Sequence, residues 1–210
     1  MIIVVNFKNH KKGKQVLELA WLIQRYNKSA IVGVPFQNIS DVSKKTKLKT
    51  YAQHLNNQFN AHKVKSLGAN GVFLNHSDHR LKFNKLKQQV IEANSRGLSI
   101  IAFISTFSEA KQIINNKALN SKINYLAFED PKLIGTGKSI TQYKASDVLK
   151  FSKLFKSPKK SKILPLCGAG ISSREDVIKA KKLGCKGVAI ASAITKEKNK
   201  NKIKELLKIS

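Results

Sequence analysis

The chain has 210 residues, of which 41% are hydrophobic and 25% charged, so it can bury the core of one large domain or two small ones. No apolar run reaches the ~18 residues of a membrane span, which excludes a membrane-spanning protein. The first residues form an apolar run with neither a basic flank nor a cleavage site, which predicts a cytoplasmic protein without a signal peptide.

The net charge of +28 comes almost wholly from lysine. A charge of this size suggests nucleic-acid binding. The lysines are spread along the chain, however, and no aromatic residues alternate with them as in single-strand binders. A solvated lysine-rich surface is therefore favoured over a nucleic-acid site. Cys167 and Cys185 are isolated and match no zinc spacing, which predicts buried free thiols.

Short apolar, β-branched runs recur along the whole chain. Most are continuous rather than alternating, which predicts strands that are buried on both faces. The eight predicted strands are Ile2–Val5, Ala30–Val34, Thr50–Gln53, Gly71–Leu74, Ser99–Ile104, Ile123–Phe128, Lys162–Cys167 and Gly187–Ala191.

Segments with helical spacing lie between the predicted strands. The clearest apolar stripes are Val16, Leu19, Ala20, Leu22 and Ile23, then Leu86, Val90 and Ala93, then Val177, Ile178, Ala180 and Leu183. Eight strand–helix units predict an α/β fold, a compact (β/α)8 barrel with short helices that forms a single domain over residues 1–210. An open doubly wound sheet is the alternative. No linker divides the chain, and residues 153–162, which contain Ser157-Pro158, are the connection expected to be most exposed.

Polar residues that suit catalysis follow several of the predicted strands. In a barrel the active site lies at the carboxyl ends of the strands. Lys8 follows the first strand, His76 the fourth and Glu129 the sixth. A single carboxylate at the end of a buried run, followed by a loop that can close, suits proton transfer. Small residues follow the seventh and eighth strands, where backbone N–H groups can approach a phosphate.

Three other motifs at these positions carry less weight. His76 and His79 are spaced i, i+3 and, with Asp78, suggest a metal site only weakly. Residues 135–139 end in Gly-Lys-Ser but lack the first glycine of a P-loop. Residues 168–170 lack the third glycine of a dinucleotide fingerprint. We therefore predict neither a metal site nor a nucleotide site.

Short motifs stand at the strand ends in a fixed order, namely Asn6-Phe7-Lys8, Gln53-His54, Asn75-His76-Ser77, Glu129, Ile134-Gly135-Thr136-Gly137, Cys167-Gly168-Ala169-Gly170-Ile171 and Gly187–Ser192. Together they resemble the triosephosphate isomerase family in its short archaeal-type form. The resemblance implies a TIM barrel that interconverts dihydroxyacetone phosphate and D-glyceraldehyde 3-phosphate through an enediolate, in glycolysis and gluconeogenesis. It also implies a small phosphorylated substrate, no metal or organic cofactor, and a homo-oligomer, either a dimer or a tetramer.

The resemblance also implies a role for individual residues. Glu129 resembles the catalytic base, His76 the neutral electrophile at the carbonyl oxygen, and Lys8 the cation that stabilises the developing oxyanion. Substrate contacts are expected from Asn6, Phe7, Lys8, Ile134, Gly135, Gly168, Gly170, Ala191 and Ser192. A lid that keeps water from the enediolate is expected from Asp130, Pro131, Lys132, Leu133, Ile134, Gly135, Thr136 and Gly137.

Four features depart from the family pattern. Asp130 replaces the proline that usually follows the catalytic glutamate, and its charge is expected to raise the pKa of Glu129. Asp78 replaces a glutamate, and the shorter side chain is expected to weaken the alignment of Lys8. Residues 57–63 lack the usual Thr-Gly, which leaves the oligomeric state open, and Lys138-Ser139 after the lid is unusual.

Two other functions stay open at this point. One is another phosphate-binding (β/α)8 enzyme, such as an aldolase. An aldolase would need a Schiff-base lysine at a central strand end, and strands four to six have none. The other is a divergent homologue that binds nucleic acid through its basic surface.

Overall fold

The structure, a computed structural model, describes residues 1–155 and 161–208. Most of the connection expected to be most exposed, residues 156–160, lies outside the described residues. The strands are β1 (Ile2–Asn6), β2 (Ile31–Val34), β3 (Lys49–Ala52), β4 (Gly71–Leu74), β5 (Ser99–Ile104), β6 (Tyr125–Glu129), β7 (Leu164–Gly168) and β8 (Gly187–Ile190).

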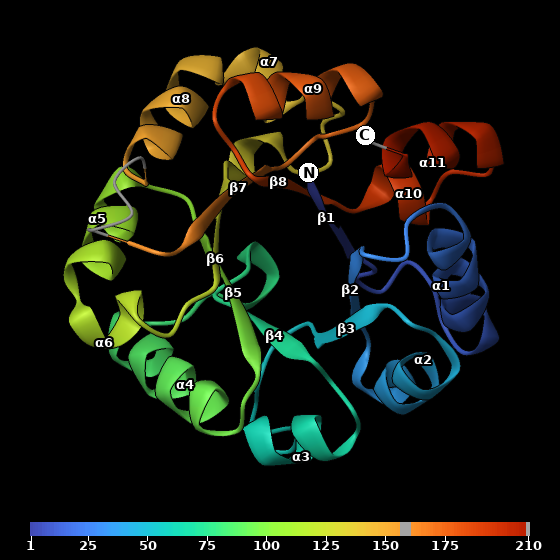
Figure 1. Ribbon diagram of the computed structural model, residues 1–210, viewed down its shortest axis with the longest axis horizontal. Helices are drawn as coiled ribbons and strands as arrows, with labels where there is room; N and C mark the ends of the chain where they lie inside the picture. Colours follow the sequence, from blue (N-terminus) through green and yellow to red (C-terminus); the bar gives the residue numbers. More distant parts are fainter. Residues whose placement is uncertain (156–160, 209–210) are drawn as a thin grey trace.

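The eight strands pair in parallel, in chain order, and close into a barrel (Figure 1). Closure comes from β1, which pairs with β2 on one side and with β8 on the other, in register Ile2 to Gly187. The predicted (β/α)8 barrel is therefore confirmed, and the open sheet is excluded because a closed barrel has no free edge. The predicted strand bounds agree with those of the structure to within two residues, with the largest differences at the starts of β6 and β7.

The helices form a ring around the barrel (Figure 1). They are α1 (Lys14–Tyr26), α2 (Ile39–Lys45), α3 (Ala61–Ser66), α4 (Phe83–Ser95), α5 (Phe107–Asn115), α6 (Lys117–Asn120), α7 (Ile140–Tyr143), α8 (Ala145–Lys153), α9 (Arg174–Lys182), α10 (Ser192–Thr195) and α11 (Lys200–Leu207), with three 3-10 turns η1 (Phe36–Asn38), η2 (Ser77–His79) and η3 (Pro131–Leu133). In the part of the chain described, no helix has the length and apolarity needed to cross a membrane.

The predicted helical stripes are buried or, at Leu22 and Leu183, partly buried, and Ile178 is the one correction. Val177 and Ala180 of α9 are fully buried, whereas Ile178 is 38% exposed. Residues three apart share a helix face, and the next residue along is turned by about 100°. Ile178 therefore faces away from the barrel, and its place in the predicted stripe was wrong.

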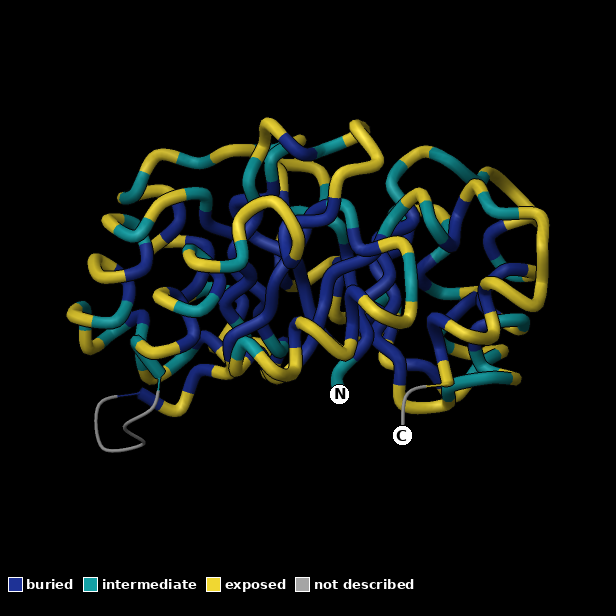
Figure 2. The backbone as a smooth tube through the Cα atoms, turned by 90° about the horizontal axis from the view of Figure 1, so that it is seen from above, coloured by how far each residue is buried: buried dark blue, intermediate teal, exposed yellow. Residues whose placement is uncertain are grey.

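The core has two parts, one inside the barrel and one between the barrel and its helices. Figure 2 shows the buried backbone at the centre and the exposed backbone around it. The inner core consists of Val4, Ile31, Tyr51, Phe73, Ile101, Phe103, Ala127, Leu166 and Ala189. Gly33 makes room for one of these rings, because a Cβ at its position would overlap Phe73. Large and small residues thus interlock and fill the barrel, which confines the open space to its ends.

Candidate active site

The three residues expected to carry the chemistry lie together at the carboxyl end of the barrel. Lys8 follows β1, His76 follows β4, and Glu129 is the last residue of β6. They line one cavity of about 400 Å³. The other residues around it are Asn6, His10, Phe103, Ile134, Gly135, Gly137, Ala169, Gly170, Ile171, Ser172, Ala189, Ile190, Ala191, Ser192, Ala193 and Lys196.

Two residues that were expected to contact substrate do not line this cavity. Phe7 is fully buried in the outer core. Side chains alternate across an extended segment, so Asn6 faces the cavity while Phe7 faces the helices. Lys8, whose φ is 47°, also lines the cavity. Gly168 ends β7 beneath the cavity, where a Cβ would come 3.0 Å from the carbonyl oxygen of Ala189. The burial of Phe7 therefore corrects its prediction, whereas the substrate contact of Gly168 stays a prediction.

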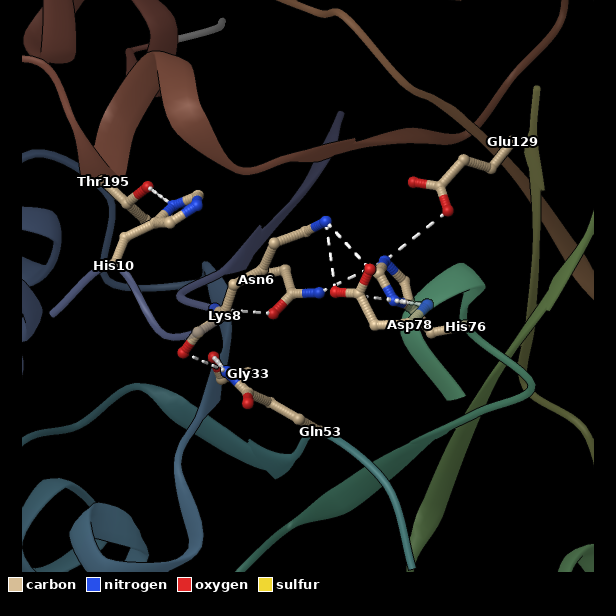
Figure 3. A network of polar contacts seen from close by, with 9 residues as sticks. All are labelled: Asn6, Lys8, His10, Gly33, Gln53, His76, Asp78, Glu129 and Thr195. Atoms are coloured by element: carbon tan, nitrogen blue, oxygen red, sulfur yellow. Dashed lines mark hydrogen bonds and ion pairs between the residues drawn. The ribbon is translucent and has the colours of Figure 1, made fainter. Parts of the chain in front are cut away.

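His76 presents one defined nitrogen to the cavity (Figure 3). Its Nδ1 accepts a hydrogen bond from the backbone N–H of Asp78 at 3.2 Å, so in the neutral ring the proton sits on Nε2. Nε2 lies 3.5 Å from Oε2 of Glu129 and 3.3 Å from Nδ2 of Asn6. The ring also packs edge-on against Phe103, with centroids 4.8 Å apart. This orientation leaves Nε2–H as a donor to any oxygen bound in the cavity.

Burial keeps His76 neutral and makes Glu129 a stronger base. Desolvation lowers the pKa of His76 to about 4, with Asp78 opposing this and Lys8 and Arg80 adding to it. Desolvation raises the pKa of Glu129 to about 7, against the charge of Lys8 and the hydroxyl of Ser77, which lower it. Near neutral pH the site therefore holds an uncharged imidazole donor and a carboxylate ready to take a proton.

Lys8 is held by Asp78 on the outer side of the site. The Nζ atom lies 3.2 Å from Oδ2 of Asp78, whose side chain is 58% exposed. Asp78 thus reaches Lys8 despite its shorter side chain, and whether the alignment is weaker than with a glutamate stays a prediction. Asp78 is also the carboxylate that adds to the raised pKa of Glu129.

Asp130 acts within its own loop rather than on Glu129. Its side chain accepts a hydrogen bond from the backbone N–H of Lys132 at 2.9 Å, and so caps η3. It is absent from the charges that shift the pKa of Glu129, which corrects the expected effect. The replacement of proline by Asp130 thus supplies a cap at the start of the loop.

Residues 130–137 form an exposed loop with one buried anchor. Leu133 packs into the outer core, whereas Pro131 and Lys132 are exposed. Ile134, Gly135 and Gly137 face the cavity. The two glycines have positive φ, 77° and 75°, and a Cβ at either would meet no atom within 4 Å. The loop therefore lies beside the cavity with open space around its turn.

Three basic residues at the site escaped the sequence prediction. His10 and Lys196 line the cavity beside Ser192. The His10 ring donates from Nδ1 to Oγ1 of Thr195 at 2.7 Å, because that hydroxyl donates its own proton to Ala191. Arg80 donates to the carbonyl oxygen of Asn75 at 3.2 Å and pairs with Glu109.

The sequence held a signal for only one of these residues. Glu109 belongs to a Thr-x-x-Glu capping box that begins with Thr106, which marks the start of α5 beside β4 and β5. The acid of that box is the partner of Arg80. His10 and Lys196 have no such marker, since they stand among 40 lysine and arginine residues and 5 histidines.

Comparison with known proteins settles the family. The sequence model of the triosephosphate isomerase family matches residues 1–208. The chain belongs to the triosephosphate isomerase family. Triosephosphate isomerase of Archaeoglobus fulgidus is 30% identical, over 98% of this chain and 96% of that protein. The enzyme of the same name from Pyrobaculum calidifontis is 32% identical over 99% and 95%, and that from Methanocaldococcus jannaschii is 30% identical over 99% of each chain.

Family membership agrees with the chemistry of the cavity. Triosephosphate isomerases are isomerases built on a TIM barrel, and they act on a small phosphorylated sugar. Among the described residues, no group of three or more His, Cys, Asp or Glu side chains could hold a metal ion. His79 instead stacks on the ring of His54, with centroids 4.4 Å apart.

Proposed function

We propose that this chain interconverts dihydroxyacetone phosphate and D-glyceraldehyde 3-phosphate. Glu129 would remove a proton from the carbon beside the carbonyl and return it to the neighbouring carbon. Its raised pKa, about 7, supports this role because a base works best when its pKa lies near the working pH. One observation carries the proposal: Glu129 Oε2 and the donor nitrogen of His76 face each other across 3.5 Å in one cavity.

His76 and Lys8 would stabilise the charge that forms on the oxygens. The neutral imidazole donates Nε2–H to the carbonyl oxygen and then to the enediolate oxygen. Lys8 Nζ supplies a fixed positive charge nearby, on a side chain that is 18% exposed. Asn6 would orient Lys8, since its Oδ1 accepts from the Lys8 backbone N–H at 3.0 Å.

The phosphate would lie at the β7–β8 side of the cavity. We propose that backbone N–H groups of Gly135, Gly170, Ala191 and Ser192 bind it, because these residues line the cavity and carry little or no side chain there. Residues 130–137 would act as the lid, closing over the phosphate and keeping water from the enediolate. The exposed glycine turn with its open surroundings supports such a motion.

A coupled assay with glyceraldehyde 3-phosphate tests the proposal. The unaltered chain should turn over, and Glu129→Gln should lose at least about 3 kcal/mol of transition-state stabilisation. Glu205→Gln, on the exposed face of α11, is the matched control and should keep full activity. Unchanged activity of Glu129→Gln would refute the assignment of the base. Tight binding of 2-phosphoglycolate, an enediolate mimic, should accompany turnover.

We also propose that the chain acts as one domain and assembles as a homo-oligomer, a dimer or a tetramer. Large apolar side chains on the surface support assembly, among them Trp21 at 48% and Ile91 at 43% exposure. Phe59 of the altered loop 57–63 stacks on Phe36 within the chain, with centroids 4.2 Å apart. Sedimentation velocity measures the oligomeric state directly, and a monomer at micromolar concentration would overturn the proposed homo-oligomer. The cytoplasmic location stays a prediction.

A further inference from the structure

The backbone of Lys8 has a conformation that a lysine rarely adopts. Its φ is 47°, in the left-handed region, and only Asn75 shares this among the non-glycine residues described. A Cβ makes this region unfavourable, so such a residue keeps it only where neighbouring groups hold the backbone. The conformation sets the direction of the Lys8 side chain, and with it the position of the ammonium group.

The side-chain amide of Gln53 contacts this backbone directly (Figure 3). Gln53 follows β3, and its Nε2 donates to the carbonyl oxygen of Lys8 at 3.1 Å and to that of Gly33 at 3.2 Å. The opposite orientation of the amide is excluded chemically, because it would place Oε1 against two carbonyl oxygens. Both hydrogens of the Gln53 amide group are therefore used on backbone acceptors.

The peptide groups on both sides of the Lys8 Cα are thereby fixed. The Lys8 N–H donates to Asn6 Oδ1 at 3.0 Å, while the Lys8 carbonyl accepts from Gln53. The carbonyl oxygen of Gly33 also accepts from the N–H of Phe7 at 2.8 Å. One amide thus ties the ends of β1, β2 and β3 together at the residue that carries the catalytic cation.

We propose that Gln53 is a positioning residue, which holds Lys8 in its left-handed conformation and so keeps the ammonium group aimed into the site. This inference rests on the proposed function, in which Lys8 stabilises the oxyanion. Gln53 does not line the cavity that holds Glu129 but a smaller one of about 170 Å³ behind Lys8, so we infer that it acts through Lys8. Side chains that fix the geometry of catalytic groups contribute strongly to rate, since a small misplacement lowers it by orders of magnitude.

Gln53→Met and Gln53→Glu test the proposal. Methionine keeps the length of the side chain without a donor, and an ionised glutamate would repel both carbonyl oxygens. We expect kcat/KM to fall about 10- to 100-fold for Gln53→Met and further for Gln53→Glu. Gln112→Met and Gln112→Glu, on the exposed face of α5, are the matched controls and should keep the original activity. Circular dichroism shows whether each variant is folded.

A double-mutant cycle separates positioning from a merely structural role. The readout is the affinity for 2-phosphoglycolate, measured by calorimetry with Gln53→Met in the original and the Lys8→Ala backgrounds. Gln53→Met should weaken binding in the original background and have little further effect when the lysine side chain is gone. An equal loss of affinity in both backgrounds would overturn the proposal. An unchanged kcat/KM in the Gln53→Met variant would overturn it as well. Absence of turnover in the unaltered chain would instead refute the proposed function.

Discussion

The burial of Glu129 should lower the stability of the folded protein, and Glu129→Gln should reveal by how much. Desolvation raises the pKa of this carboxyl from 4.5 to about 7. Each pKa unit corresponds to about 1.36 kcal/mol, so the ionised carboxylate destabilises the fold by about 3 kcal/mol. Glutamine has nearly the same shape and cannot ionise, so the variant should escape this destabilisation.

The sign and the pH range follow from where the proton is held. Between pH 4.5 and about 7 the folded chain keeps the Glu129 proton that the unfolded chain releases. Raising the pH through this range therefore favours the unfolded state. Glu129→Gln should gain stability relative to the original chain across the same range. The gain should be complete above pH 7 and absent below pH 4.5.

Denaturant unfolding followed by circular dichroism measures the free energy of unfolding of both chains at about pH 4 and about pH 8.5. The difference between the two chains is the stability gap. The gap between Glu129→Gln and the original chain should grow by about 3 kcal/mol from the lower to the higher pH. His76 also titrates at low pH, but both chains contain it, so the comparison isolates Glu129. Glu205→Gln, which removes a carboxylate from an exposed position, is the matched control. A gap of equal size at both pH values would refute the reasoning.

Three further outcomes are expected. The kcat/KM should rise with pH through a pKa near 7 and level off above it, because Glu129 must be ionised to act as the base. A half-maximal kcat/KM below pH 5.5 would contradict the assignment of Glu129 as the base. Asp130→Ala should remove the hydrogen bond that the Lys132 backbone N–H donates to the Asp130 side chain, a cap worth about 1 kcal/mol. Hydrogen exchange in residues 131–137 should then become faster. Unchanged exchange would show that the cap does not order the loop. Gly170→Ala should lower stability by about 2 kcal/mol or more, since its Cβ would overlap the Lys138 carbonyl. Gly135→Ala has similar φ but open space, so it should cost only about 1 kcal/mol; equal losses in melting temperature would count against overlap as the cause.

The strands were predictable because their surroundings are simple. A strand between barrel interior and helices is buried on both faces, so it appears in the sequence as a continuous apolar run. The runs at 2–5 and 71–74 needed almost no adjustment. Ile178 was misplaced because a helix buries only one face, and a run of neighbouring apolar residues does not mark which face that is.

The catalytic candidates were predictable from their place at strand ends. Lys8, His76 and Glu129 come together because parallel strands end at one edge of the barrel. Phe7 was misassigned although it stands between two residues of the site. Adjacent side chains of an extended segment point to opposite faces, and the sequence motif alone carries no record of which face each residue takes.

The two aspartates show why charge effects were harder to predict. Asp130 is adjacent to Glu129 in sequence, yet its carboxylate turns to its own loop. Asp78 is remote in sequence, yet it pairs with Lys8 and shifts the pKa of both His76 and Glu129. Electrostatic coupling depends on distance through space and on burial, and neither can be measured along the chain.

The pairing of β1 with β8 has a consequence for synthesis of the chain. Residue Ile2 pairs with Gly187, so the partner of β1 is made 185 residues after it (187 − 2). At about 5–20 residues per second, the edge of β1 waits roughly 10 to 40 s for its neighbour. An unpaired strand edge invites pairing with other chains during that time. A change that weakens the β1–β8 pairing should therefore increase aggregation during translation more than it destabilises the finished protein.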